Sequence, residues 1–380
     1  MGCTSSSEPR EEPRPASRTG ASASVPNKSK ESNSQKSPAP VPAPNNSNSS
    51  KPLPAPSPAP TNASSSKGPR PACLNLSCKS PGATVEQPDV CSSCGTSLLI
   101  QGRFRVTTIL GIGGFGRTMI GWDLKSPTHS PANPTKVVVK QFCMDTSTPD
   151  RMAFCAKAKE LFIKEALQLK KLGIHKNIPT MLAHADEKDG WLLVQEFIDG
   201  IDCYQDMRSG WVWTEAKLIA FLRSVLTTLA YVHENQVIHR DIKPANIMRR
   251  LSDGEYVLID FGAAKEVTRD IVLNRNTSIG TTGYIAPEIG RGECYYNSDL
   301  YSLAATVVFF MTRTEPADVK PSVEYYKTYL RIPISQKFAY IIDQCLSFDP
   351  RQRPLRAIDV LSQLDAVISS SANSTAQSSK

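Results

Sequence analysis

Hydrophobic and polar positions follow two different periods along this chain. Between residues 103 and 142, RFRVTTILGIGGFGRTMIGWD and KVVVKQF carry apolar residues at alternate positions or in short β-branched runs, which predicts strands. From residue 156 to 173, AKAKELFIKEALQLKKLG carries them at a spacing near 3.6, which predicts an amphipathic helix. WLLVQEFIDG (191–200) is typical of a buried strand that runs into a turn.

The longest apolar run, LAATVVFFM (303–311), predicts a buried helix, because about 20 apolar residues are needed to span a bilayer. AIDVLSQLDAVI (357–368) predicts the last helix, and a Ser-rich tail follows it. The N-terminus has no apolar stretch of the kind that a secretory signal requires, so we expect a cytoplasmic protein. Ten cysteines then indicate thiols or metal ligands rather than disulfides.

The composition changes sharply near residue 72. Residues 1–72 hold 15 of the 29 prolines and no aromatic residue, so they cannot bury enough apolar surface to order themselves. We expect a disordered Pro/Ser-rich tail there and about 290 residues of ordered protein after it. The tail carries nine Lys and Arg against four Asp and Glu, so the ordered part is only weakly basic and gives no case for nucleic acid.

The chain begins MGCTSS, which fits the pattern for myristoylation of Gly2, with Cys3 available for a second acyl chain. In a host that has the transferase, this predicts peripheral membrane association through the N-terminus. In a bacterium without it, the pattern has no such meaning.

A glycine-rich turn joins the first two predicted strands at Gly111-x-Gly113-Gly114-x-Gly116. Dinucleotide-binding folds also use this spacing, but there the glycines open a helix. Here RTMIGWD follows, which alternates as a strand does. A strand, glycine loop and second strand form a flap whose backbone amides can close over phosphates.

A phosphate site also needs a fixed positive charge. Lys140 ends the apolar run KVVVK, and Glu165 lies toward the apolar face of the predicted helix, where an isolated carboxylate is costly. We expect Lys140 to pair with Glu165, with Glu160 as the alternative partner.

Four polar residues further along complete the candidate chemistry. Asp241, Lys243 and Asn246 lie in the Pro-interrupted stretch HRDIKPAN, and Asp260 follows the apolar run YVLI. Carboxylate and amide oxygens suit Mg²⁺, a role that fits Asn246 and Asp260. Asp241 is then left to orient and deprotonate a hydroxyl, and Lys243 to counter the charge of a transferring phosphoryl group.

In order and spacing, these motifs resemble the signature set of protein kinases over residues 103–365. The motifs are LGIGGFGRT, Lys140, Glu165, HRDIKPAN, DFG and APE, and the form KPAN resembles the serine/threonine branch. The resemblance implies an α+β bilobal fold over residues 103–367, with a β-rich N-lobe (103–195), a helical C-lobe (200–367) and a disordered tail (368–380). It also implies that ATP and Mg²⁺ bind between the lobes and that proteins are phosphorylated on Ser or Thr.

The resemblance also implies a nucleotide pocket. Gln195 would guard its back, Glu196 to Ile198 would form the hinge, and Met248 would floor the adenine. Thr118 and Val138 stand where the family usually has Val and Ala, which alters the pocket slightly. The remaining residues implied to bind ATP are Leu110, Gly111, Ile112, Gly113, Gly114, Phe115, Gly116, Lys140 and Asp260. Outside the pocket, Asp299 resembles an aspartate that braces the catalytic loop, and Arg353 the arginine that pairs with Glu288.

Hydroxyls in NTSIGTTGYIAPE suggest a switch between Asp260 and Glu288. A phosphate on Thr277 or Ser278 could pair with Arg240 and order the segment, so we expect autophosphorylation there. The bland alternative is that these hydroxyls only form turns.

Four cysteines precede the first strands, as Cys73-x4-Cys78 and Cys91-x2-Cys94. Two such pairs form the usual tetrahedral zinc arrangement, and about 27 residues need a staple to fold. We therefore expect a zinc-ribbon-like unit over residues 73–100. A reversible thiol switch and simple packing are the alternatives. Four cysteines followed by these motifs resemble the cyanobacterial serine/threonine kinases.

Other classes of protein remain to be weighed. A pseudokinase scaffold would lack Lys140, Asp241, Asn246 or Asp260, and all four are present. A small-molecule phosphotransferase would not be expected to carry APE and the distal arginine. A zinc-ribbon interaction protein is an alternative for residues 73–100 alone, but that stretch has little Lys or Arg and no aromatic residue for stacking bases.

Overall fold

The structure is a computed structural model that describes residues 72–82, 88–113, 116–142, 149–187, 190–261, 282–316 and 332–377. The tail over residues 1–71 and the proposed switch residues Thr277 and Ser278 lie outside the described residues. Within the described ranges, no helix is long and apolar enough to cross a membrane.

The N-terminal part is built on an antiparallel sheet of six strands in the order β1-β2-β3-β4-β6-β5. Its strands are β1 (Leu99–Ile100), β2 (Phe104–Gly113), β3 (Gly116–Asp123), β4 (Lys136–Phe142), β5 (Met181–Glu187) and β6 (Gly190–Glu196). Helix α1 (Pro149–Leu172) is inserted between β4 and β5. Strands β2, β3, β4 and β6 and helix α1 correspond to elements that the periodicity predicts, whereas no prediction covers β1 and β5.

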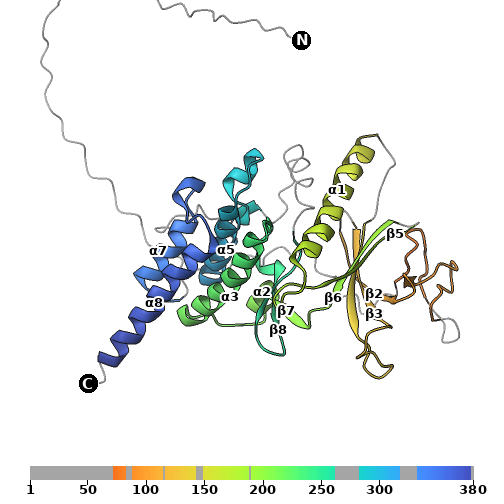
Figure 1. Ribbon diagram of the computed structural model, residues 1–380, viewed down its shortest axis with the longest axis horizontal. Coiled ribbons are helices and arrows are strands. Elements are labelled where there is room, and N and C mark those ends of the chain that lie inside the picture. The colour runs from red at the N-terminus through yellow and green to blue at the C-terminus, as the bar shows by residue number, and fades with distance from the viewer. Residues whose placement is uncertain are drawn as a thin grey trace, which may run out of the picture. The chain divides into compact units, whose positions relative to one another are not determined.

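The C-terminal part is mainly helical. Helices α2 (Cys203–Arg208), α3 (Glu215–Glu234), α5 (Tyr296–Thr312), α7 (Gln336–Cys345) and α8 (Ala357–Gln377) make up most of it. Figure 1 shows α3, α5, α7 and α8 gathered together and separate from the sheet. The apolar run at 303–311 is the centre of α5, where every residue from Asn297 to Thr312 is buried.

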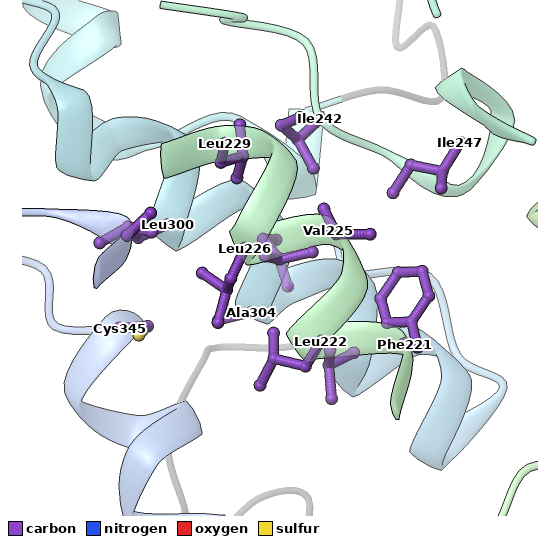
Figure 2. Packing of buried hydrophobic residues seen from close by; sticks show 14 of the residues in the cluster. Phe221, Leu222, Val225, Leu226, Leu229, Ile242, Ile247, Leu300, Ala304 and Cys345 are labelled. Atoms are coloured by element: carbon purple, nitrogen blue, oxygen red, sulfur yellow. The ribbon is translucent and has the colours of Figure 1, made fainter. Parts of the chain in front are cut away.

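Helix α3 provides one side of the C-terminal core. Figure 2 shows Phe221, Leu222, Val225, Leu226 and Leu229 along this helix, in one cluster with Ala304 of α5, Cys345 of α7 and Ile247 of β8. These five side chains are at most 3% exposed. Burying a side chain of this size contributes about 1.5–3 kcal/mol, so this face accounts for much of the stability of the helix.

A small sheet and short 3-10 helices hold the loops between these helices. The sheet contains β7 (Gly200–Asp202), β8 (Ile247–Arg250) and β9 (Tyr256–Leu258). The 3-10 helices are η1 (Pro244–Asn246), η2 (Thr282–Tyr284), η3 (Pro287–Arg291) and η5 (Pro350–Gln352). Because η1 leads straight into β8, the stretch HRDIKPAN is fixed at the start of the central strand of this sheet.

One boundary differs from that expected. Helix α8 continues to Gln377, past residue 367, because extending a formed helix costs much less than nucleating one. The described residues of the four-cysteine unit pack on the six-stranded sheet and not on a core of their own, as expected of so short a segment. Its strand β1 pairs with β2, and its buried residues join the apolar cluster of the six-stranded sheet.

Candidate active site

One ammonium group stands between two carboxylates. Lys140 Nζ, on β4, lies 2.5 Å from Glu165 Oε1 on α1 and 2.5 Å from Asp260 Oδ1, which follows β9. The side chains of Lys140 and Glu165 are 15% and 9% exposed, whereas that of Asp260 is 44% exposed. The partner of Lys140 is therefore Glu165, as expected, and Asp260 joins the pair on its open side.

Electrostatic interactions keep Lys140 and Asp260 charged. Burial alone would lower the pKa of Lys140, but the two carboxylates more than offset it and raise that pKa. Burial alone would raise the pKa of Asp260, and the Lys140 ammonium reverses this and lowers it. The structure therefore places a permanent positive charge beside a carboxylate that faces open space.

The loop before β8 brings three more of the candidate residues together. Asn246 Nδ2 donates to Asp241 Oδ2 at 2.6 Å and to the Asp241 carbonyl oxygen at 2.9 Å. Lys243 Nζ lies 3.2 Å from Asp241 Oδ2. Because Asn246 Nδ2 donates both of its hydrogens to Asp241, Asn246 Oδ1 is the atom that can accept a hydrogen bond or bind a metal ion.

A buried aspartate holds the start of this loop in place. Asp299 is fully buried, and its carboxylate accepts from the backbone N–H groups of His239 (2.9 Å) and Arg240 (2.8 Å). It also lies 2.9 Å from His233 Nε2. His239 Nε2 lies 3.1 Å from the Ile259 carbonyl oxygen, so the brace reaches the residue before Asp260. The contact expected of Asp299 is present, and His233 is a further member that no motif indicated.

The backbone is strained at two places in this site. Arg240 has φ 66° and Asp260 has φ 59°, in the left-handed region that residues other than glycine seldom adopt. Each such residue costs of order 1–3 kcal/mol and persists only where its surroundings hold it. The bonds to Asp299 and to Lys140 supply that hold.

The residues expected around a nucleotide base share one face of the sheet. Thr118 pairs with Lys140 across β3 and β4, and Val138 pairs with Gln195 across β4 and β6. Because side chains alternate along strands, these four lie on the same face. Gln195 and Ile198 are 5% and 6% exposed.

The other expected pocket residues lie at its edges. Met248 is half-buried in β8, Glu196 is exposed at the end of β6, and Leu110 and Ile112 in β2 are exposed. Gly114 and Phe115, at the tip of the glycine turn, lie outside the described residues. Gly116 must be glycine, since a Cβ atom there would lie 2.2 Å from the Gln141 carbonyl oxygen.

Glu288 and Arg353 form the ion pair expected of them. Arg353 Nη1 and Nη2 donate to the two carboxylate oxygens of Glu288 at 2.6 and 2.8 Å, and both side chains are fully buried. Ser298 Oγ donates to the same carboxylate at 2.6 Å.

The four cysteines converge on one point. Their Sγ atoms all lie within 4.8 Å of one another, with Cys73 and Cys94 3.5 Å apart and Cys78 and Cys91 3.7 Å apart. All four are free thiols. Gly95, with φ 73°, makes the turn that closes the second pair.

Comparisons with known proteins agree with this geometry. A family model described as the protein kinase domain matches residues 104–363. Serine/threonine-protein kinase B of Synechocystis is 34% identical over 77% of this chain and 51% of its own length. Serine/threonine-protein kinase PknA of Nostoc is 33% identical over 70% of this chain and 47% of its own. The chain thus spans about half the length of these curated relatives.

Among solved structures, the Mycobacterium tuberculosis PknI kinase domain aligns with 71% of this chain and 98% of its own, with a TM-score of 0.52 and 20% identity. At that identity the likeness concerns the fold alone. Together with the family match over residues 104–363, it shows that this chain belongs to the protein kinase family.

Proposed function

We propose that this chain is a serine/threonine protein kinase that transfers the γ-phosphate of ATP to hydroxyl groups of proteins. The observation that carries the proposal is the completeness of the site. Lys140 contacts both Glu165 and Asp260, and Asn246 donates a hydrogen bond to Asp241 in the loop before β8. The printed names of the cyanobacterial relatives support the serine/threonine branch.

Each residue then has a role that follows from its contacts. Lys140, held by Glu165, would leave Asp260 and bind the phosphates of ATP. Asp241 would orient the substrate hydroxyl and accept its proton, with the carboxylate held in place by Asn246 and Lys243. Lys243 would also offset negative charge on the phosphoryl group as it moves.

The residues present fit a magnesium ion. Asn246 has its Oδ1 left over from its bonds to Asp241, and the Asp260 carboxylate is partly open to solvent. Oxygen donors of this kind are what Mg²⁺ takes alongside phosphate oxygens and water. When bound, the ion would neutralise charge on the phosphate chain.

The base of ATP would lie on the sheet face that carries Thr118, Val138 and Gln195. The backbone from Glu196 to Ile198 would meet its polar edge, and Met248 would lie beneath it. The glycine turn from Leu110 to Gly116 would cover the phosphates.

We infer zinc for the four cysteines. Four free thiols within 4.8 Å of one another supply the ligand set of a structural zinc site. Metal analysis of the reduced protein tests this inference. One zinc per chain is expected, and a metal-free protein whose activity follows the redox potential would favour the thiol switch.

The experiment that tests the kinase proposal measures transfer of labelled γ-phosphate to a protein. Asp241→Asn is expected to lower transfer by about 10²–10⁴-fold, the contribution typical of a positioned acid or base. Asp253→Asn, in the exposed turn after β8, is the matched control and should leave the rate unchanged. Label that appears only on small molecules, or a rate that Asp241→Asn leaves intact, would contradict the proposal.

Two expectations concern residues outside the described ranges. If Thr277 is phosphorylated to order its segment, the substitution Thr277→Ala should lower activity. If Gly2 is acylated, the protein should associate with membranes in a host that has the transferase. A soluble fraction unchanged by Gly2→Ala would count against acylation.

A further inference from the structure

Strands β3 and β4 present two different surfaces. Thr118, Val138 and Lys140 lie on the face that we assign to ATP. Their neighbours Arg117, Met119, Val139 and Gln141 lie on the opposite face, because side chains alternate along a strand. Any contact that moves Arg117 or Gln141 therefore moves the backbone that carries Lys140.

The four-cysteine unit, defined here as residues 72–82 and 88–100, packs on this opposite face. Figure 1 shows the unit in orange beside the sheet. The buried residues of the unit and of the sheet form a single apolar cluster: Ala72, Cys73, Leu74, Cys91, Leu98, Ile100, Phe104, Val106, Met119, Val137, Val139, Ala185, Leu192 and Val194. Two of the four cysteines are thus buried against the back of the nucleotide strands.

Polar bonds connect the same two parts. Arg117 Nη2 donates to the carbonyl oxygens of Cys73 (2.5 Å) and Leu74 (3.1 Å). Gln141 Nε2 donates to the Leu74 carbonyl oxygen at 2.8 Å, and Arg117 Nε donates to Gln141 Oε1 at 2.8 Å. Gln141 is 1% exposed and is the residue next to Lys140. A closed ring of bonds thus joins a cysteine, its neighbour and two strands.

The unit is also attached at two other points. Arg105 on β2 pairs with Asp89 at 2.5 Å, and the Ala72 N–H donates to the Thr107 carbonyl oxygen at 2.9 Å. The first residue of the unit and its middle are therefore held on the sheet, and its last residues pair with β2 through β1. Cys73, next to the first of these points, is one of the four residues whose sulfur atoms converge.

A metal at that point would fix the acceptors of Arg117. Short metal-binding segments owe their folded geometry to the metal, and without it the ligands separate. The carbonyl groups of Cys73 and Leu74 would then be free to shift, and the bonds to them from Arg117 Nη2 and Gln141 Nε2 would weaken or break. Because Gln141 is 1% exposed, the loss of one of its bonds there is costly.

We propose that Arg117 and Gln141 are positioning residues, through which zinc in the four-cysteine unit sets the strand geometry at Lys140. The inference rests on the proposed kinase function and zinc site. It predicts that zinc affects the affinity for nucleotide more than the chemical step. The reason is that Asp241 and Lys243, which we assign to transfer, belong to the loop before β8 and not to the sheet on which the unit packs.

The test uses the full chain under reducing conditions, either zinc-loaded or stripped with a chelator. Binding of a fluorescent ATP analogue gives Kd, and phosphotransfer gives KM for ATP and kcat. Stripping is expected to raise Kd and KM by about fivefold or more, at the low end of measured couplings between two sites, while kcat changes by less than about twofold. Cys78→Ser should reproduce the stripped behaviour.

The decisive comparison is a thermodynamic cycle that combines the substitution of Arg117 with the removal of zinc. In Arg117→Met, Kd should already be raised in the zinc-loaded protein, and stripping should add little, because the connection is gone. Arg117→Lys should restore only part of the affinity, since a single ammonium cannot reproduce the forked contact. Arg103→Ala is the matched control: Arg103 is bidentate to Asp123 on the same sheet, so this variant should respond to stripping as the wild type does.

Three results would overturn the proposal: equal effects of stripping in Arg117→Met and in the wild type, an unchanged Kd on stripping, or full affinity in a chain that never binds zinc. The analogue-binding measurement also separates this proposal from the kinase proposal. A chain that binds nucleotide in a zinc-dependent way but transfers no phosphate would refute only the latter.

Discussion

Two groups of buried charges in this molecule are built from the same kinds of side chain and behave differently. Arg353 and Glu288 face each other with two parallel bonds, and Ser298 and the Ser347 carbonyl oxygen take up further bonding positions. Neither side chain has any exposed surface. Lys140 is instead shared between two carboxylates, one of which is 44% exposed.

The difference lies in whether the protein satisfies the charges completely. In the closed pair, every partner is supplied from within the C-terminal part, so the pair contributes to structure alone. In the open cluster, the Asp260 side chain is partly exposed to solvent. A charged ligand could therefore replace Asp260 as the partner of Lys140. A buried ion pair therefore indicates a site only where one of its members remains accessible.

Breaking the closed pair should give the largest effect. Arg353→Met leaves Glu288 buried without its cation and is expected to lower the free energy of unfolding by about 3–5 kcal/mol. Urea denaturation measures it. Arg351→Met, an exposed arginine two residues away, is the matched control and should change stability by less than about 0.5 kcal/mol. A loss below about 1 kcal/mol in Arg353→Met would mean that the pair is not structural.

Breaking the open cluster should affect activity instead. Lys140→Met is expected to lower phosphotransfer by about 10²–10³-fold, the loss typical of removing one group that stabilises developing charge. Its loss of stability should be smaller than that of Arg353→Met, because Asp260 can turn to solvent and because burial already raises the pKa of Glu165, which can lose its charge by taking up a proton. Lys136→Met, on the same strand with an exposed side chain, should retain the rate. A Lys140→Met protein that unfolds as readily as Arg353→Met would remove the distinction between the two groups.

Acid should act on the closed pair with the smallest effect. Burial alone would raise the pKa of Glu288, but the bonds from Arg353 and Ser298 lower it below the usual 4.5. Its stabilising contribution is therefore complete above about pH 4.5 and is lost as the pH falls through the lower, folded-state pKa. Glu288→Gln should flatten the acid limb of stability against pH. An acid limb that Glu288→Gln leaves as steep as in the wild type would contradict this assignment.

The residues of the candidate active site could be predicted because each follows a local pattern. Lys140 ends a β-branched run, Glu165 falls on the apolar face of a helix at 3.6-residue spacing, and Asp241 and Asn246 flank a proline that prevents a regular helix. Burial of a carboxylate requires a partner, and this argument selected Glu165 for Lys140 before the fold was known.

The attachment of the four-cysteine unit could not be predicted in this way. Arg117 and Gln141 are polar residues on a strand face that also carries Met119, Val137 and Val139, and nothing local indicates what they bond. Their acceptors are backbone carbonyl groups 43 and 67 residues away at Leu74, and a carbonyl group has no sequence signature. The extension of α8 to Gln377 was missed because Ser and Ala are equally common in tails.

By itself, the sequence determined the elements, the glycine turn, the residues of the candidate active site and the grouping of four cysteines, since all of these depend on residue type and short spacing. Only the tertiary structure decided which side of the sheet each part occupies. Because a strand presents alternate residues to opposite faces, neighbours such as Lys140 and Gln141 serve different surfaces. What covers each surface depends on chain segments that are distant in sequence, and these meet only when the protein folds.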